Sequence, residues 1–85
     1  MGKAYIIGAI HQITNNDDGS ATFLINQIPD DNGVTCVTRC LVDRERWDVV
    51  KGDLDENENC CVAGEFNSDK DLNVSKIAVL KMDEA

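Results

Sequence analysis

The stretch "RCLVDRERWDVVKG", Arg39 to Gly52, changes from strand spacing to helix spacing and so decides the fold. Its first residues end the apolar, β-branched run "VTCVTRCLV", which is typical of a strand. Asp43 is a good N-cap, and it places Val42 and Trp47 at the two positions of the hydrophobic staple. Gly52 is a natural C′ residue after a helix. The stretch predicts a strand followed by a helix of about two turns, which is too short to be stable unless Trp47 packs into a core.

Apolar and β-branched segments on both sides of this helix predict strands. Turn-forming residues, including "NNDDGS" and "PDDNG", separate the first three into a meander. Gly8 and Gly64 lie inside two of the segments, and a glycine inside a strand marks a bulge or a sharp bend. Two bent strands favour a sheet that closes on itself. The predicted strands cover residues 3–13, 21–28, 34–42, 59–66 and 72–82.

The predicted order is β-β-β-α-β-β in a single domain, residues 1–85, without internal repeats or an interdomain linker. This order resembles the OB-fold, a five-stranded Greek-key barrel, with a helix between its third and fourth strands. SH3-like barrels lack a capped helix at that point, and Sm-like barrels place their helix first. We therefore predict an all-β barrel with one short helix, the five-stranded Greek-key OB-fold.

Within OB-folds the chain resembles a minimal single-stranded DNA-binding protein of the bacterial SSB and primosomal type. The matching pieces are "IIGAI" in the first strand, "ATFLI" in the second, "VKGD" before the fourth and "CVAGEF" as the fourth. In that family a "KG" followed by an apolar-x-x-G strand occupies the same places. The resemblance implies non-enzymatic binding of single-stranded DNA, although the chain has fewer aromatic and basic residues than the family uses.

OB-folds bind oligonucleotides across strands two and three and the loops beside them, with aromatic platforms and basic residues. Phe23 alternates with buried-type neighbours, which also favours a place in the core. Arg44 and Arg46 have acidic neighbours in the sequence with which they can pair on the surface. The candidate nucleic-acid-binding residues are Arg39, Arg44, Arg46, Lys70, Thr38 and Phe23.

The face on which Arg39 lies is left open by the sequence. Arg39 shares strand parity with Val37 and Leu41. If those two point into the core, a buried arginine needs a partner. If Val42 and the two cysteines of this strand point inward instead, Arg39 is exposed beside an apolar strip, which would suit a partner or a dimer mate.

The net charge of −8 counts against nucleic acid, because acidic proteins repel phosphate. It favours an alternative, an acidic OB-fold module for protein–protein interaction, either an adaptor or a subunit. The acidic clusters at residues 17–18, 30–31 and 53–58 also motivate a nucleic-acid mimic that binds a basic protein. A chain of 85 residues buries a modest core, so a homodimer is a further expectation.

No catalytic motif is recognisable. His11 is the single histidine, no serine lies in a G-x-S-x-G motif, and there is no Walker or G-x-G-x-x-G motif. Cys36, Cys40, Cys60 and Cys61 lack the paired spacing of structural zinc sites, so we predict reduced, mostly buried thiols. We expect no enzyme activity, no cofactor and no metal. Free thiols, no apolar leader and no run of membrane-spanning length predict the cytoplasm and no membrane partner.

Overall fold

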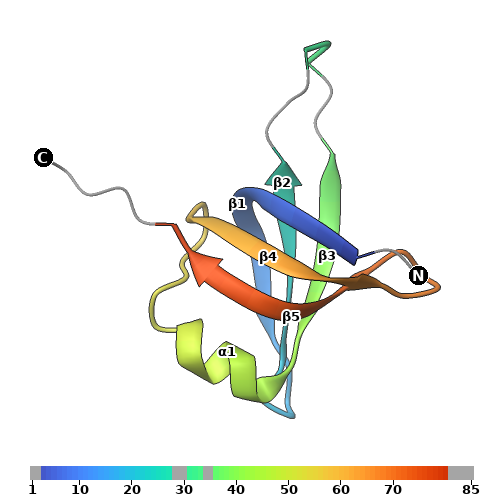
Figure 1. The fold of residues 1–85 in the computed structure, drawn as a ribbon. Coiled ribbons are helices and arrows are strands. Elements are labelled where there is room, and N and C mark those ends of the chain that lie inside the picture. The colour runs from blue at the N-terminus through green and yellow to red at the C-terminus, as the bar shows by residue number, and fades with distance from the viewer. Residues whose placement is uncertain (1–2, 28–30, 34–35, 81–85) are drawn as a thin grey trace, which may run out of the picture.

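The computed structural model describes residues 3–27, 31–33 and 36–80, and its elements follow the predicted order. The strands close into a barrel in the order β1-β2-β3-β5-β4, and the helix lies across one end of it (Figure 1). This confirms the predicted all-β barrel with one short helix. The elements are β1 (Lys3–Asn15), β2 (Ala21–Gln27), β3 (Val37–Val42), α1 (Arg44–Val50), β4 (Asn59–Phe66) and β5 (Leu72–Val79).

The strand ends differ from the prediction at several places. β1 runs on to Asn15, because it continues past a bulge as the partner of β2. β3 begins at Val37, and Cys36 lies just before it. The predicted strand residues 28, 34–35 and 81–82 lie outside the described residues. In the part that is described, β5 ends at Val79.

β1 belongs to both halves of the barrel, because residues 3–9 pair with β4 and residues 8–15 pair with β2. Gly8 lies at the crossover, opposite both Gln27 and Cys60. A Cβ on Gly8 would lie 2.1 Å from the carbonyl oxygen of Asn26, so only glycine allows the two backbones to approach this closely. The register shift of β1 falls later, between His11 and Thr14. Gly8 is therefore a site of close approach, and the bulge is a separate feature.

The predicted irregularity at Gly64 is confirmed, because the register of β4 against β5 shifts between Ala63 and Gly64. The partner strand carries the extra residue here, and the Ser75 hydroxyl donates to the Ala63 carbonyl at 3.2 Å. The parallel pairing of Cys40 with Leu72 joins β3 to β5 and closes the barrel.

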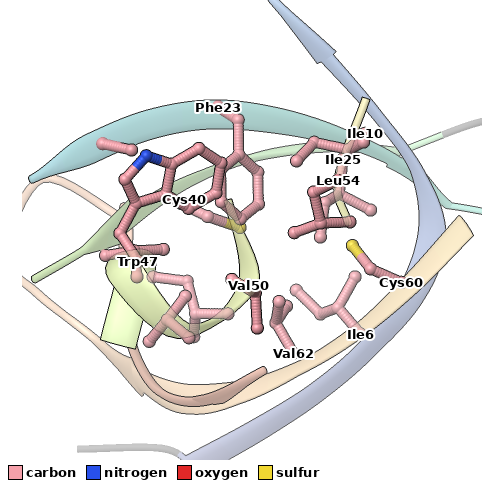
Figure 2. Packing of buried hydrophobic residues seen from close by; sticks show 14 residues of the cluster. Ile6, Ile10, Phe23, Ile25, Cys40, Trp47, Val50, Leu54, Cys60 and Val62 are labelled. Carbon is pink, nitrogen blue, oxygen red and sulfur yellow. The ribbon is translucent and has the colours of Figure 1, made fainter. Parts of the chain in front are cut away.

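Trp47 is part of the core, as predicted, with 3% of its surface exposed. Its ring lies beside that of Phe23, with centroids 6.0 Å apart (Figure 2). Its Nε1–H donates to Asn15 Oδ1 at 2.8 Å, which satisfies the polar end of the indole. Val42 is 2% exposed in the same cluster, so both residues of the predicted staple are buried.

Both ends of α1 lie where the sequence predicted them. Asp43 is the N-cap, and its carboxylate accepts the backbone N–H of Arg46 at 2.9 Å. Lys51 is the C-cap, so Gly52 stands at the C′ position as predicted, although its φ is not positive. The chain instead leaves the helix through a turn in which the Asp53 N–H donates to the Val50 carbonyl at 2.8 Å.

The four cysteines are free thiols in different surroundings. Cys40 and Cys60 are buried as predicted, and burial raises their pKa values to about 12 and about 11. They are therefore protonated and unreactive at neutral pH. Cys61 is half-buried, and Cys36, which lies just before β3, is exposed, so the predicted burial does not extend to it.

Among the described residues, no three His, Cys, Asp or Glu side chains gather as ligands for a metal ion. The same part of the chain contains no helix of the length and apolarity that a membrane crossing requires.

Candidate nucleic-acid interface

The burial pattern of β3 decides which way Arg39 points. Cys40 and Val42 are buried, so Val37, Arg39 and Leu41 lie on the outer face of the strand. Val37 is 56% exposed, and the Arg39 side chain is also 56% exposed. Of the two alternatives left by the sequence, the one with Arg39 exposed beside an apolar strip is confirmed.

Register places Arg39 in a row of side chains that crosses three strands. His11 on β1 lies opposite Leu24 on β2, and Leu24 lies opposite Arg39 on β3. On either side of this row, Asn26 lies opposite Val37 and Thr22 lies opposite Leu41. The outer face of β2 and β3, with His11 at its border, is called the β2–β3 face below. In the described residues it combines apolar and small polar side chains with one guanidinium group.

Arg39 forms an ion pair with Asp71, the residue that precedes β5. Arg39 Nη1 lies 3.6 Å from Asp71 Oδ2, and the Asp71 side chain is only 18% exposed. The loop that carries Asp71 is held by Asn67, whose side-chain oxygen accepts the N–H groups of Asp69 and Asp71 at 2.9 and 3.0 Å. The distal loop, residues 67–71, is thus ordered against the β2–β3 face.

Lys70 lies in this loop with its backbone in the left-handed region, at φ 65°. A residue with a side chain is strained there, and glycine or asparagine is the usual occupant. Its N–H donates to the Asn67 carbonyl at 3.0 Å, which completes the turn. The side chain is exposed and, in the part of the chain that the structure describes, pairs with no acid.

The two helical arginines have different surroundings. Arg44 packs against the β1–β2 loop, where a Cβ on Gly19 would lie 2.9 Å from its Cδ, and its Nε is 4.0 Å from Asp48 Oδ2. Arg46 is engaged by the fold, because Nη1 contacts the Asp43 carboxylate and Nε donates to the Ser75 carbonyl at 2.6 Å. Arg46 therefore links the helix cap to the bulge of β5.

Phe23 and Thr38 point toward the inside of the barrel. Phe23 is 0% exposed and packs against Trp47, so a base has no ring surface to stack on, and the interface proposed below does not include it. Thr38 shares the inward parity of Cys40 and is half-buried. The sequence had already favoured the core for Phe23 through its alternation with Ala21 and Ile25, which are both buried.

His11 and Leu24 lie on the β2–β3 face and Asp71 lies beside it, although none of them was among the candidate residues. Leu24 follows Phe23, which the sequence already favoured as a core residue, so the alternation along β2 could have placed Leu24 on the outer face. Nothing local indicates that Asp71 meets Arg39, because that contact depends on the parallel pairing of β3 with β5.

Several acids of this chain are engaged internally. Glu56 accepts the N–H groups of Gln12 and Ile13 in the β1 bulge, each at 3.0 Å, and these bonds lower the pKa of its carboxyl. Hydrogen bonds from the hydroxyl and N–H of Ser20 lower the pKa of Asp18 in the β1–β2 loop. These carboxylates hold the segments that border the β2–β3 face, so part of the acidity has a structural role.

Solved structures with the same fold identify the architecture. The mitochondrial single-stranded DNA-binding protein Rim1 from S. cerevisiae superposes with a TM-score of 0.81 at 18% identity, covering 94% of each chain. This chain has the OB-fold. The small single-stranded DNA-binding protein from Streptomyces coelicolor superposes with a TM-score of 0.69 at 15% identity, covering 91% of this chain and 90% of its own.

A third similar OB-fold is the dimeric N-terminal domain of PriB protein from Thermoanaerobacter tencongensis, with a TM-score of 0.67 at 10% identity, covering 94% of this chain and 97% of its own. These neighbours confirm the predicted likeness to SSB-like and primosomal OB-fold proteins at the level of the fold. No family model and no curated protein matches the sequence.

Proposed function

We propose that this OB-fold binds single-stranded DNA on the β2–β3 face without catalysing a reaction on it. The observation that carries the proposal is the exposed Arg39 in the middle of that face, beside Leu24 and Leu41. A guanidinium flanked by apolar side chains suits a strand whose phosphates and bases alternate along its length. The similarity of the fold to single-stranded DNA-binding proteins supports the same function.

In this proposal Arg39 and Lys70 contact phosphates, with Arg44 beside the β1–β2 loop as a more peripheral cation. The bases lie over Leu24 and Val37, with His11 at the border as the ring on which one base can stack. A net charge of −8 opposes the approach of DNA at long range. We therefore expect weak binding that depends strongly on salt, with each phosphate contact adding about −0.7 to the slope of log K against log salt.

Arg39→Ala is expected to weaken binding about three- to tenfold and to make the salt slope shallower by about 0.7. The reason is the loss of one phosphate contact from the centre of the face. The measurement is the fluorescence anisotropy of a labelled oligothymidine, titrated with protein at several salt concentrations that begin at tens of millimolar.

Lys76→Ala is the matched control, because it removes one positive charge from the outer side of β5, away from the β2–β3 face. Lys70→Gly is a second variant that removes the other proposed phosphate contact. Glycine relieves the left-handed strain at this position, so we expect the variant to be more stable than wild type. Weaker binding by this variant would therefore not result from unfolding. Equal binding by Arg39→Ala and wild type, or no binding by wild type at tens of millimolar salt, would contradict the proposal. The second result would leave the acidic protein-interaction module as the better hypothesis.

We also propose that two copies associate through an apolar patch on the opposite side of the barrel. Tyr5 and Ile7 are 76% and 51% exposed on β1, and the register places Ile7 beside Cys61 and Ala78. Burial of such a patch would supplement the modest core of a small domain.

Static light scattering is expected to give twice the mass of one chain, and Ile7→Asp is expected to give a folded monomer. A monomeric wild type would contradict this proposal without affecting that on DNA.

All four cysteines are free thiols, which supports a reducing compartment, and the cytoplasm is the one we propose.

A further inference from the structure

Asp71 is placed where it competes with DNA for Arg39. Its carboxylate lies 3.6 Å from the Arg39 guanidinium, and no other ionic or hydrogen-bonding partner of either side chain occurs among the described residues. A carboxylate and a phosphate present the same kind of oxygen acceptor to an arginine. In the free protein Asp71 therefore occupies the guanidinium that is proposed to contact a phosphate.

The distal loop keeps Asp71 in this position. Its N–H donates to the Asn67 side chain at 3.0 Å, and its carbonyl accepts the Asn67 N–H at 2.9 Å. The next residue, Leu72, is fully buried and pairs with Cys40 of β3. Because the backbone is held on both sides, a ligand can displace the Asp71 carboxylate from Arg39 only by turning the side chain.

The Asp71 carboxylate also affects the pKa of the thiol of Cys40, the residue after Arg39. Burial is the main cause of the raised pKa of the Cys40 thiol, and the charges of Cys60 and Asp71 add to it. The geometry agrees, because Asp71 lies 3.6 Å from Arg39 and precedes Leu72, which pairs with Cys40 of β3.

The ion pair is weak enough to be displaced. At 3.6 Å it is longer than a charge-assisted hydrogen bond, and the exposed side of the guanidinium is open to solvent. The arginine half of the pair is exposed, so a phosphate can reach the guanidinium without the loop having to open.

We propose that Asp71 sets the affinity of this protein for single-stranded DNA, because it occupies Arg39 in the free protein and must be displaced by a phosphate. This inference rests on the proposed DNA-binding function. It implies that Asp71 and Arg39 act as one unit: removing the Asp71 charge strengthens binding only while Arg39 is present. A carboxylate that simply repels DNA would act equally with and without Arg39.

A double-mutant cycle tests the coupling. Asp71→Asn, Arg39→Ala and the double variant are titrated with the labelled oligothymidine at one low salt concentration. Asp71→Asn is expected to bind about two- to fivefold more tightly than wild type, and most of this gain is expected to vanish in the Arg39→Ala background. Asp69→Asn is the control, because it removes an exposed acid from the same loop without touching Arg39, and it is expected to change binding little.

Thermal unfolding of each variant, followed by circular dichroism, confirms that the proteins compared are folded. Unchanged binding by folded Asp71→Asn would overturn this inference and leave the proposed function standing. An equal gain from Asp69→Asn, or an undiminished gain in the Arg39→Ala background, would also overturn it, because either would mean general repulsion. Absence of binding by both wild type and Asp71→Asn would overturn the proposed function and this inference together.

Discussion

Replacing Gly64 with alanine is expected to destabilise the protein by at least about 3 kcal/mol, or to prevent it from folding. A Cβ at this position would lie 1.9 Å from the carbonyl oxygen of Asn73 and 2.8 Å from its carbonyl carbon. Both are backbone atoms of β5, so no side-chain rotation can relieve the contact. Accommodation of the methyl group requires β4 and β5 to separate at the bulge, where the register between them shifts.

Urea unfolding followed by circular dichroism measures this loss as a lower midpoint. Gly52→Ala is the control, because it adds the same methyl group where, apart from the chain neighbours, none of the described residues comes within 4 Å and where φ is not positive. Its free energy of unfolding is expected to be unchanged or raised by up to about 1 kcal/mol, since alanine restricts the unfolded chain. If Gly64→Ala has the same urea midpoint as wild type, then β4 and β5 do not approach each other at Gly64 as closely as described above.

Trp47→Ala is expected to cost about 3–5 kcal/mol of stability, because it leaves a large cavity under α1. The indole packs beside Phe23 in the core and is the largest side chain that the helix contributes (Figure 2). Without it, α1 retains Val50 as its other buried residue. A helix of this length is not stable alone, so the end of the barrel that it covers is expected to open as well.

Trp47→Phe separates packing from hydrogen bonding. Phenylalanine keeps most of the ring contact with Phe23 and loses the bond from Nε1 to Asn15, for an expected cost of about 1–2 kcal/mol. Circular dichroism is the suitable measurement, because the chain has a single tryptophan and each variant removes it. Trp47→Ala and Trp47→Phe proteins of equal stability would contradict the central place of the indole in the core.

The features predicted correctly from the sequence are those that depend on neighbouring residues in the chain. Asp43 caps α1 because its carboxylate reaches an N–H three residues on, and this needs no other part of the protein. Trp47 was placed in the core because helical spacing brings it under Val42. Gly52 stands at C′ as predicted, and the chain then turns toward buried Leu54.

The candidate interface could be predicted only in part, because the residues proposed for it come from different strands. Arg39 was a candidate, yet its face depended on whether Cys40 or Leu41 entered the core. Arg46 had the same charge and a similar neighbourhood in the sequence, but its guanidinium donates to a carbonyl of β5, 29 residues away. Only the tertiary structure shows that Arg39 lies exposed on the β2–β3 face whereas Arg46 is hydrogen-bonded to β5.

The sequence by itself determined the order of the elements, the capped helix and the burial of Trp47. These follow from local backbone preferences and from the periodicity of apolar residues, which act over a few residues. The tertiary structure alone decided that His11, Leu24 and Arg39 form one row and that Asp71 faces Arg39. Strand register and barrel closure set these contacts, and both depend on packing between segments that are distant in the chain.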